Sequence, residues 1–143
     1  MVTIDQVDSR YLIGATNWVG VDLPAHCTAL GKVLYAYGAL TLPRGNLERR
    51  TAHSPVDRAQ FDHALVEVRR RGWGASLDEL ELGLTAVGAP VRSVDGTVVA
   101  AISVSGPTNR INEYGITKLG DLLVAELRGL SALLGHHARK DNQ

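Results

Sequence analysis

A turn signal between two apolar runs constrains the fold of this chain more than any other feature. Asp95 and Gly96 separate the runs LTAVGAPVRS and TVVAAISVS, and an Asp-Gly pair between such runs is typical of a β-hairpin. If these two residues form the turn, Val94 faces Thr97, and the pairing of every other residue in the two strands is fixed. The sequence therefore predicts an antiparallel hairpin of defined register.

That register gives the hairpin two unlike faces. One face carries only small residues, two of them with hydroxyls: Ala86, Gly88, Ser103 and Ser105. The other face is apolar and typical of a surface on which helices pack: Val87, Ala89, Val98, Ala100, Ile102 and Val104. Small residues leave volume that either closely packed backbone or a ligand must fill, and the sequence leaves both readings open. A carboxylate or hydroxyl group of a ligand would give the two hydroxyls hydrogen-bond partners.

Strands and a helix are also expected before the hairpin. The runs VTIDQV and YLIGATNWVGV, with Asp8 and Ser9 at a turn, predict two strands of one antiparallel sheet within residues 1–22. A helix should begin between Pro24 and Thr28 and end at a left-handed Gly38. The segment WGAS, ahead of the acidic run LDELELG, predicts one more strand.

Two later helices have signals of their own. Ser54 as N-cap, Pro55 at the first position and Asp57 in a capping box predict a helix that Gly72 ends. Its buried face is expected to contain Phe61, Leu65 and Val68, and its last turn Arg69, Arg70 and Arg71, a solvated cationic helix end. A long final helix should run from about Asn112 or Thr117 to Leu134, on an apolar stripe of Ile116, Leu119, Leu123, Leu127, Leu130 and Leu134. Antiparallel strands with helices on one side predict an α+β domain.

Composition restricts the class of protein. The 143 residues carry 15 Lys plus Arg against 15 Asp plus Glu, so the chain lacks the basic excess of a nucleic-acid-binding surface. No apolar run is long enough to span a membrane, and the start MVTIDQVDSR is acidic where a signal peptide is basic. We therefore expect one cytoplasmic domain that does not contact membranes.

The sequence contains few groups arranged for catalysis. No GxSxG or HExxH motif is present. His26 and Cys27 are adjacent and would not readily bind one zinc ion together with His53 or His63, because neighbouring side chains diverge. Cys27 as a nucleophile lacks a placed base, and disulfide exchange would need a second cysteine. We expect a protein that is not an enzyme and needs no cofactor or metal. The alternatives are a reductase or metal-dependent hydrolase on a similar scaffold, and an oligomerisation module without a ligand.

Five segments together resemble the effector-binding domain of IclR-family bacterial transcriptional regulators. In chain order they are IDQVDS (4–9), LPAHCTALGKVLYAY (23–37), RRRGWGAS with LDELELG (69–83), GAPV (88–91) and AAISVSGPTNRI (100–111). The resemblance implies a GAF-like fold, a curved antiparallel sheet flanked by helices, that senses a small molecule. It identifies residues 1–143 as the effector-binding domain, without the winged helix-turn-helix domain and opening strands that precede it in the family. DNA would then be bound only through that other domain, and the protein would form a homodimer or homotetramer.

The resemblance also implies an effector site. The positions of this chain that match the family's effector site are Leu12, Ala15, Ala29, Leu30, Ser76, Leu84, Ala86, Ser103 and Ser105. The backbone amides of Ala29 and Leu30 would bind an acidic effector at a helix N-terminus. Ser76, Ala86 and Ala15 stand where members that bind small keto acids tend to carry Asp, Cys and Met. A roomier, less polar cavity is expected, which favours an aromatic or medium-sized carboxylic acid.

Overall fold

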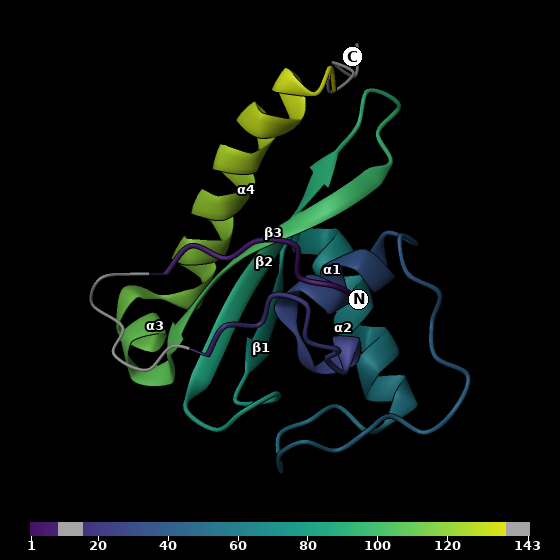
Figure 1. Cartoon of the computed structure of the whole chain (residues 1–143), viewed down its shortest axis with the longest axis vertical. Coiled ribbons are helices and arrows are strands. Elements are labelled where there is room, and N and C mark those ends of the chain that lie inside the picture. The colour runs from purple at the N-terminus through teal and green to yellow at the C-terminus, as the bar shows by residue number, and fades with distance from the viewer. Residues whose placement is uncertain (9–15, 137–143) are drawn as a thin grey trace.

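A computed structural model describes residues 1–8 and 16–136 (Figure 1). A short 3₁₀ helix, η1 (Ala25–Cys27), leads into α1 (Ala29–Ala36), which is followed by α2 (Arg58–Arg71). A three-stranded antiparallel sheet follows: β1 (Gly74–Leu77), β2 (Leu84–Arg92) and β3 (Val98–Pro107). The helices α3 (Thr108–Tyr114) and α4 (Ile116–Leu133) complete the described fold, an α+β domain as predicted. None of the described helices is long and apolar enough to cross a membrane.

The β2–β3 pairing has the predicted register, although the turn differs. Ala86 pairs with Ser105 and Gly88 with Ser103, as the Asp-Gly signal indicated. The turn is one residue longer than expected, because the Ser93 amide donates to the Thr97 carbonyl at 2.9 Å. An irregularity between Val91 and Arg92 offsets this extra residue, so the register of the central strand is preserved.

Helices cover both faces of the sheet, which corrects the expectation that they lie on one side. In Figure 1, α4 runs along one side of the sheet, while α1 and α2 lie on the other. The apolar face packs on α4 through a buried cluster of Trp73, Ala75, Val87, Ala89, Val91, Leu123 and Leu127. Because α4 contacts mainly β2, Ile102 and Val104 on β3 each remain 41% exposed.

The small-residue face packs closely on α1 along part of its length. A Cβ atom added at Gly88 would lie 3.2 Å from the carbonyl carbon of Ala29, and one at Gly74 would lie 3.3 Å from the Ala29 oxygen. A larger side chain at either position would push the helix backbone away from the sheet by a few tenths of an ångström. At Gly88, backbone packing therefore fills the volume that the sequence left unexplained.

The predicted boundaries of α1 and the predicted end of α2 are confirmed, whereas the predicted start of α2 is wrong. Helix α1 begins after Thr28, and Gly38, just beyond its end, has a φ of +74°. Helix α2 ends at a left-handed Gly72 as predicted, but its N-cap is Asp57 rather than Ser54. The Ser54 hydroxyl instead accepts from the amides of Arg50 and Thr51, so the helix begins three residues later.

The long C-terminal helix begins at the later of its two expected starts: α4 runs from Ile116, next to Thr117, to Leu133. Residues 108–114 form the separate helix α3, which was not predicted, and Gly115 with a φ of +102° divides it from α4. In the apolar stripe of α4, Leu123 and Leu127 are buried, whereas Leu130 and Leu134 are 36% and 52% exposed.

The two strands expected within residues 1–22 are wrong for the part that the structure describes. Residues 1–8 and 16–22 form only an isolated parallel bridge between Thr3 and Val19. The Gln6 side chain accepts from the Trp18 amide and donates to the Thr16 carbonyl. Side-chain hydrogen bonds thus take the place of a strand ladder.

Candidate functional site

The N-terminus of α1 is capped by the side chain of Thr28. The Thr28 hydroxyl accepts from the Gly31 amide at 2.9 Å and donates to the Ala25 carbonyl at 3.0 Å. Within the described residues, the amides of Ala29 and Leu30 donate no hydrogen bond. Unpaired amides at a helix N-terminus favour a negatively charged group.

A serine on β1 fixes the segment that precedes this helix. The buried Ser76 hydroxyl donates to the Cys27 carbonyl at 2.6 Å. Ser76 lies opposite Ala86, which in turn pairs with Ser105, so the three residues form a row across the small-residue face. The start of α1 is thereby fixed at one end of this row.

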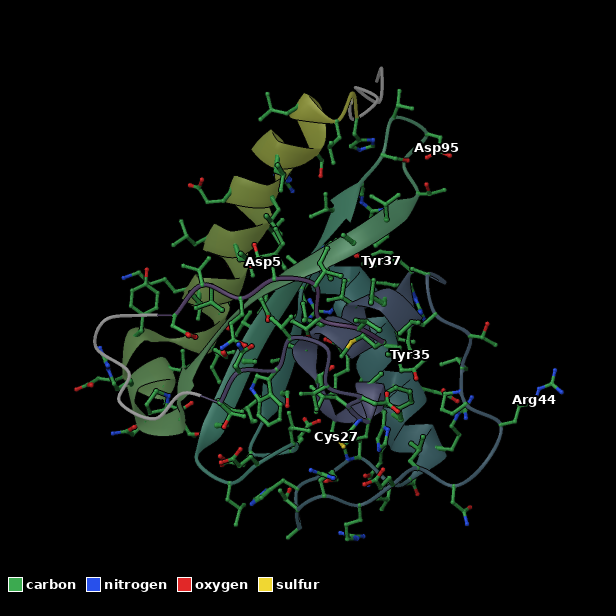
Figure 2. All side chains as sticks on the ribbon, viewed as in Figure 1. Asp5, Cys27, Tyr35, Tyr37, Arg44 and Asp95 are labelled. Atoms are coloured by element: carbon green, nitrogen blue, oxygen red, sulfur yellow. The ribbon has the colours of Figure 1, made fainter. Side chains whose placement is uncertain are left out.

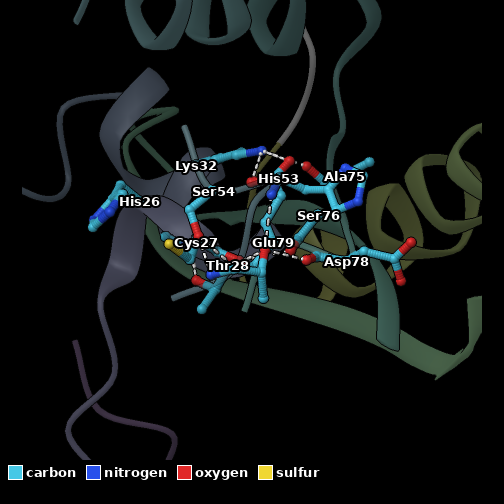
Figure 3. A network of polar contacts seen from close by, with 12 residues as sticks. His26, Cys27, Thr28, Lys32, His53, Ser54, Ala75, Ser76, Asp78 and Glu79 are labelled. Atoms are coloured by element: carbon cyan, nitrogen blue, oxygen red, sulfur yellow. Dashed lines mark hydrogen bonds and ion pairs between the residues drawn. The ribbon is translucent and has the colours of Figure 1, made fainter. Parts of the chain in front are cut away.

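A buried ion pair fixes the next turn of α1 (Figure 3). The Lys32 Nζ atom lies 2.6 Å from each carboxylate oxygen of Glu79, donates a hydrogen bond to Oε1, and donates a second to the Ala75 carbonyl at 2.8 Å. Glu79 Oε2 has the ionic contact only, without a hydrogen-bond donor among the described residues. Burial lowers the pKa of Lys32 and raises the pKa of Glu79, and each is partly offset by the partner's opposite charge.

The turn between β1 and β2 contacts several elements through Asp78 and Glu79. Asp78 has a φ of +55°, and its Oδ1 atom accepts from the Gly83 amide at 2.8 Å and the Thr108 hydroxyl at 2.7 Å. These hydrogen bonds lower the pKa of Asp78. The backbone carbonyls of Asp78 and Glu79 accept from the hydroxyls of Thr51 at 2.6 Å and Ser54 at 2.8 Å, respectively.

The nine predicted effector residues occupy different environments. Leu12 and Ala15 lie outside the described residues. Ala29 and Ser76 are buried at the contact between α1 and the sheet. The other five are partly or fully exposed: Leu30, Leu84, Ala86 and Ser103 are half-buried, and Ser105 is exposed. The structure therefore places Ala29 and Ser76 at the same buried contact between α1 and the sheet, although the Ser76 hydroxyl bonds Cys27 rather than Ala29. Ala86 and Ser105 continue the row that Ser76 begins on this face.

A groove of about 430 Å³ lies elsewhere, beside β1, and none of the nine residues lines it. Its lining includes Lys32, Glu79, Arg71 and Trp73. Arg71 Nε donates to the Trp73 carbonyl at 2.8 Å, as Lys32 does to that of Ala75. The backbone carbonyls of Trp73 and Ala75, at the β1 edge of the sheet, therefore already accept side-chain hydrogen bonds. This opposes the pairing of another strand with β1.

Sequence reasoning missed the polar residues that fix the site, namely Lys32, Asp78, Glu79 and Thr108. One signal was available: Lys32 is a single charge within the otherwise apolar helix ALGKVLYA. A charge at such a position needs a partner, and the acidic run LDELELG supplied one. The pairing itself spans 47 residues and has no local signature.

The described residues contain no cluster of three or more His, Cys, Asp or Glu that could hold a metal ion. Cys27 is fully buried, and burial raises the pKa of its thiol, which opposes thiolate formation. His26 is also buried and makes a 2.7 Å contact from Nε2 to the Glu48 carbonyl.

The fold is an α+β domain in which the Thr28-capped N-terminus of α1 lies against the small-residue face of an antiparallel sheet. Residues 1–132 match the family described as bacterial transcriptional regulator IclR C-terminal. The chain belongs to this family.

Named relatives support the same family assignment. The chain is 31% identical over 142 residues to the HTH-type transcriptional regulator KdgR of Escherichia coli, covering 96% of this chain and 54% of the relative. It is 34% identical over 122 residues to the Pca operon regulatory protein of Acinetobacter baylyi, covering 81% of this chain and 44% of that protein. The chain thus spans about half the length of the regulators it matches.

Among solved structures, Thermotoga maritima IclR superposes with a TM-score of 0.82 and 26% identity, covering 94% of this chain and 57% of that one. The inducer-binding domain of the Acinetobacter PobR transcription factor, a double mutant in complex with 3-hydroxybenzoic acid, superposes with a TM-score of 0.73 and 30% identity. That match covers 88% of this chain and 75% of the PobR chain. The similar proteins described here are named as transcriptional regulators rather than as enzymes.

Proposed function

We propose that this chain is the small-molecule-sensing domain of a cytoplasmic bacterial transcriptional regulator and that its effector is an aromatic or medium-sized carboxylic acid. The observation that carries the proposal is that the amides of Ala29 and Leu30, at the N-terminus of α1 and beside the small-residue face of the sheet, donate no hydrogen bond within the described residues. The free amides of Ala29 and Leu30 suit a carboxylate, and the hydroxyls of Ser103 and Ser105 suit its polar substituents. The PobR domain bound to 3-hydroxybenzoic acid supports an aromatic acid for a protein of this fold.

The effector would act by shifting a population of domain arrangements. An acid that binds one arrangement of paired sensor domains more tightly than another changes the spacing of the attached DNA-binding domains. We propose that the intact protein is a homodimer or homotetramer and contacts DNA only through a winged helix-turn-helix domain that precedes residues 1–143. The equal numbers of basic and acidic residues fit a sensor half that does not itself hold DNA.

Strand β3 supports the idea that opening strands of a longer protein complete this domain. Its ten residues, VVAAISVSGP, include no charged side chain. Val99 is 58% exposed, and within the described residues no hydrogen bond reaches the outer edge of this strand. Natural sheets protect an edge of this kind with charges or cover it with another strand. The proposed opening strand would pair there.

Thermal unfolding in the presence of carboxylic acids tests the sensing function. A ligand that binds only the native state raises the midpoint by mass action. We expect a rise of several degrees, about 2.7 kcal/mol at 100 times the dissociation constant, with an aromatic acid from a panel of aliphatic and aromatic acids. Ser105→Leu should abolish the rise by filling the face next to Ala86, whereas the matched change Ser93→Leu in the distant hairpin turn should retain it. An unchanged midpoint with every acid would contradict the proposal.

A further inference from the structure

The β1–β2 turn holds two parts of the domain that the proposed effector would contact together. Glu79 extends to α1, where it pairs with Lys32 three residues after Ala29. Its neighbour Asp78 extends to Thr108, the first residue of α3 and three residues after Ser105. One two-residue segment thus joins the helix N-terminus to the end of β3. Within the described residues neither carboxylate hydrogen-bonds a predicted effector residue, although the Asp78 backbone amide donates to the Leu84 carbonyl at 3.0 Å.

The contact between Asp78 and the end of β3 is built from three hydroxyl and amide groups. The Thr108 hydroxyl donates to Asp78 Oδ1 at 2.7 Å, so its oxygen accepts from the Thr85 hydroxyl, 2.9 Å away. Thr85 is fully buried and follows Leu84, a predicted effector residue. The Thr108 amide also donates to the Gly83 carbonyl at 2.9 Å. These bonds determine where β3 ends relative to the start of β2.

The contacts of Glu79 determine where α1 begins relative to β1. The buried Lys32 ammonium joins Glu79 to the Ala75 carbonyl, and the adjacent Ser76 holds the Cys27 carbonyl. Figure 3 shows these groups converging on the segment 75–79. The turn is itself fixed from outside by the hydroxyls of Thr51 and Ser54. Side chains supported in this way can hold a binding geometry more rigidly than a loop alone.

We propose that Asp78 and Glu79 are positioning residues of the effector site: Glu79 sets the place of the Ala29 and Leu30 amides, and Asp78, through Thr108, sets the place of Ser103 and Ser105. This inference rests on the proposed sensing function. It assigns effector affinity to a turn that lies outside the predicted set of contact residues.

The test uses two threonines that make the same side-chain hydrogen bond, Thr108 in a half-buried position and Thr97 in an exposed one. Thr108 donates to Asp78, and Thr97 donates to Asp95 in the β2–β3 turn, both at 2.7 Å. Thr108→Val and Thr97→Val each remove one such hydroxyl with little change in side-chain volume. Isothermal titration with 3-hydroxybenzoate and benzoate measures the dissociation constant for both variants and for the unaltered chain.

We expect Thr108→Val to raise the dissociation constant about tenfold, within the usual range of coupling between sites. Thr97→Val should change it less than about twofold, as expected for a distant, independent position. Thr108→Ser, which keeps the hydroxyl, should restore binding. If Thr108→Val lowers only the unfolding midpoint and binds as the unaltered chain does, the positioning role is wrong while the sensing function stands. If the unaltered chain binds neither acid, the aromatic-acid proposal fails together with this inference.

Glu79→Gln tests the other half of the inference if Thr108→Val does not fold. The amide keeps the side-chain volume but removes the charge that faces Lys32. A tenfold loss of affinity in a folded Glu79→Gln protein supports the positioning of α1, and unchanged affinity overturns it.

Discussion

The two turns of the sheet use the same chemistry and differ in what they contact. In each, an Asp carboxylate accepts from a Thr hydroxyl and a backbone amide, Asp78 from Thr108 and Gly83, and Asp95 from Thr97. The β1–β2 turn makes further hydrogen bonds to α1, to the segment 50–54 and to the start of α3. The hydrogen bonds of residues 93–97, in contrast, stay within residues 92–97 of the described chain.

The β2–β3 turn therefore only closes a hairpin, whereas the β1–β2 turn also holds α1, the segment 50–54 and the start of α3 in place. Figure 2 shows Asp95 at the tip of the hairpin, well away from Cys27 at the start of α1. A change at the β2–β3 turn should therefore act locally. A change at the β1–β2 turn should reach the helix N-terminus, because the same residues fix both.

Breaking the Lys32–Glu79 pair should have the largest effect on stability. Lys32→Met leaves Glu79 buried without a partner, and losing one member of a buried pair typically costs about 3–5 kcal/mol. Urea denaturation measures the change. Lys32→Met combined with Glu79→Leu should recover most of it, because no unpaired charge remains. The exposed pair Arg58–Asp62 is the control: Arg58→Ala should cost less than about 1 kcal/mol. Equal costs for Lys32→Met and Arg58→Ala would show that the buried pair contributes no more to stability than an exposed one.

Replacing the serine that hydrogen-bonds each turn should lower the free energy of unfolding by less than breaking the ion pair does, and by unequal amounts for the two turns. Ser54 is buried, and its hydroxyl accepts from two amides and donates to the Glu79 carbonyl. Ser54→Ala leaves these groups unpaired and should cost about 1–3 kcal/mol in urea denaturation. Ser93 sits in the more exposed turn, where water replaces the lost hydrogen bonds, so Ser93→Ala should cost less. The reverse order would show that the β1–β2 turn is not the stronger anchor.

The smallest expected effect is a pH dependence at the β2–β3 turn. Hydrogen bonds from Ser93 and Thr97 lower the pKa of Asp95 from 3.8 to about 2. A depressed carboxyl pKa adds stability above the unfolded value, and that stability is lost as pH falls from about 4 toward 2. Asp95→Asn should remove this part of the acid dependence when unfolding midpoints are compared across that range. An unchanged profile would show that the carboxylate contributes nothing there.

Much of the sheet was predictable because its determinants are local. The Asp-Gly signal and the alternation of small and apolar residues gave the β2–β3 register correctly, and the left-handed glycines gave two helix ends. Helix α3 was missed because its seven residues, TNRINEY, carry no apolar stripe: only Ile111 among them is buried. The prediction that all helices lie on one side of the sheet was also wrong, because nothing in the sequence shows that the small-residue face would pack against α1.

The candidate site was predictable only in part. Ser76 and Ala29, which the family resemblance placed in the effector site, both lie where α1 packs on the sheet, and their role there stays a prediction. The residues that hold them were not predicted, because Lys32 meets Glu79 across 47 positions and Asp78 meets Thr108 across 30. Side-chain contacts over such separations have no periodicity or motif to reveal them. The prediction of Ser54 as the N-cap of α2 was wrong for the same reason, because its hydroxyl donates to the Glu79 carbonyl in the distant β1–β2 turn.

A ¹⁵N–¹H correlation spectrum of the chain titrated with 3-hydroxybenzoate shows where an aromatic acid binds. We expect the largest shifts at the amides of Ala29 and Leu30, with smaller shifts at Ser103 and Ser105. We expect no shift at Thr97 or Gly96 in the hairpin turn. Shifts that centre instead on Arg71 and Trp73, beside the groove at β1, would contradict the assignment of the effector site to the N-terminus of α1.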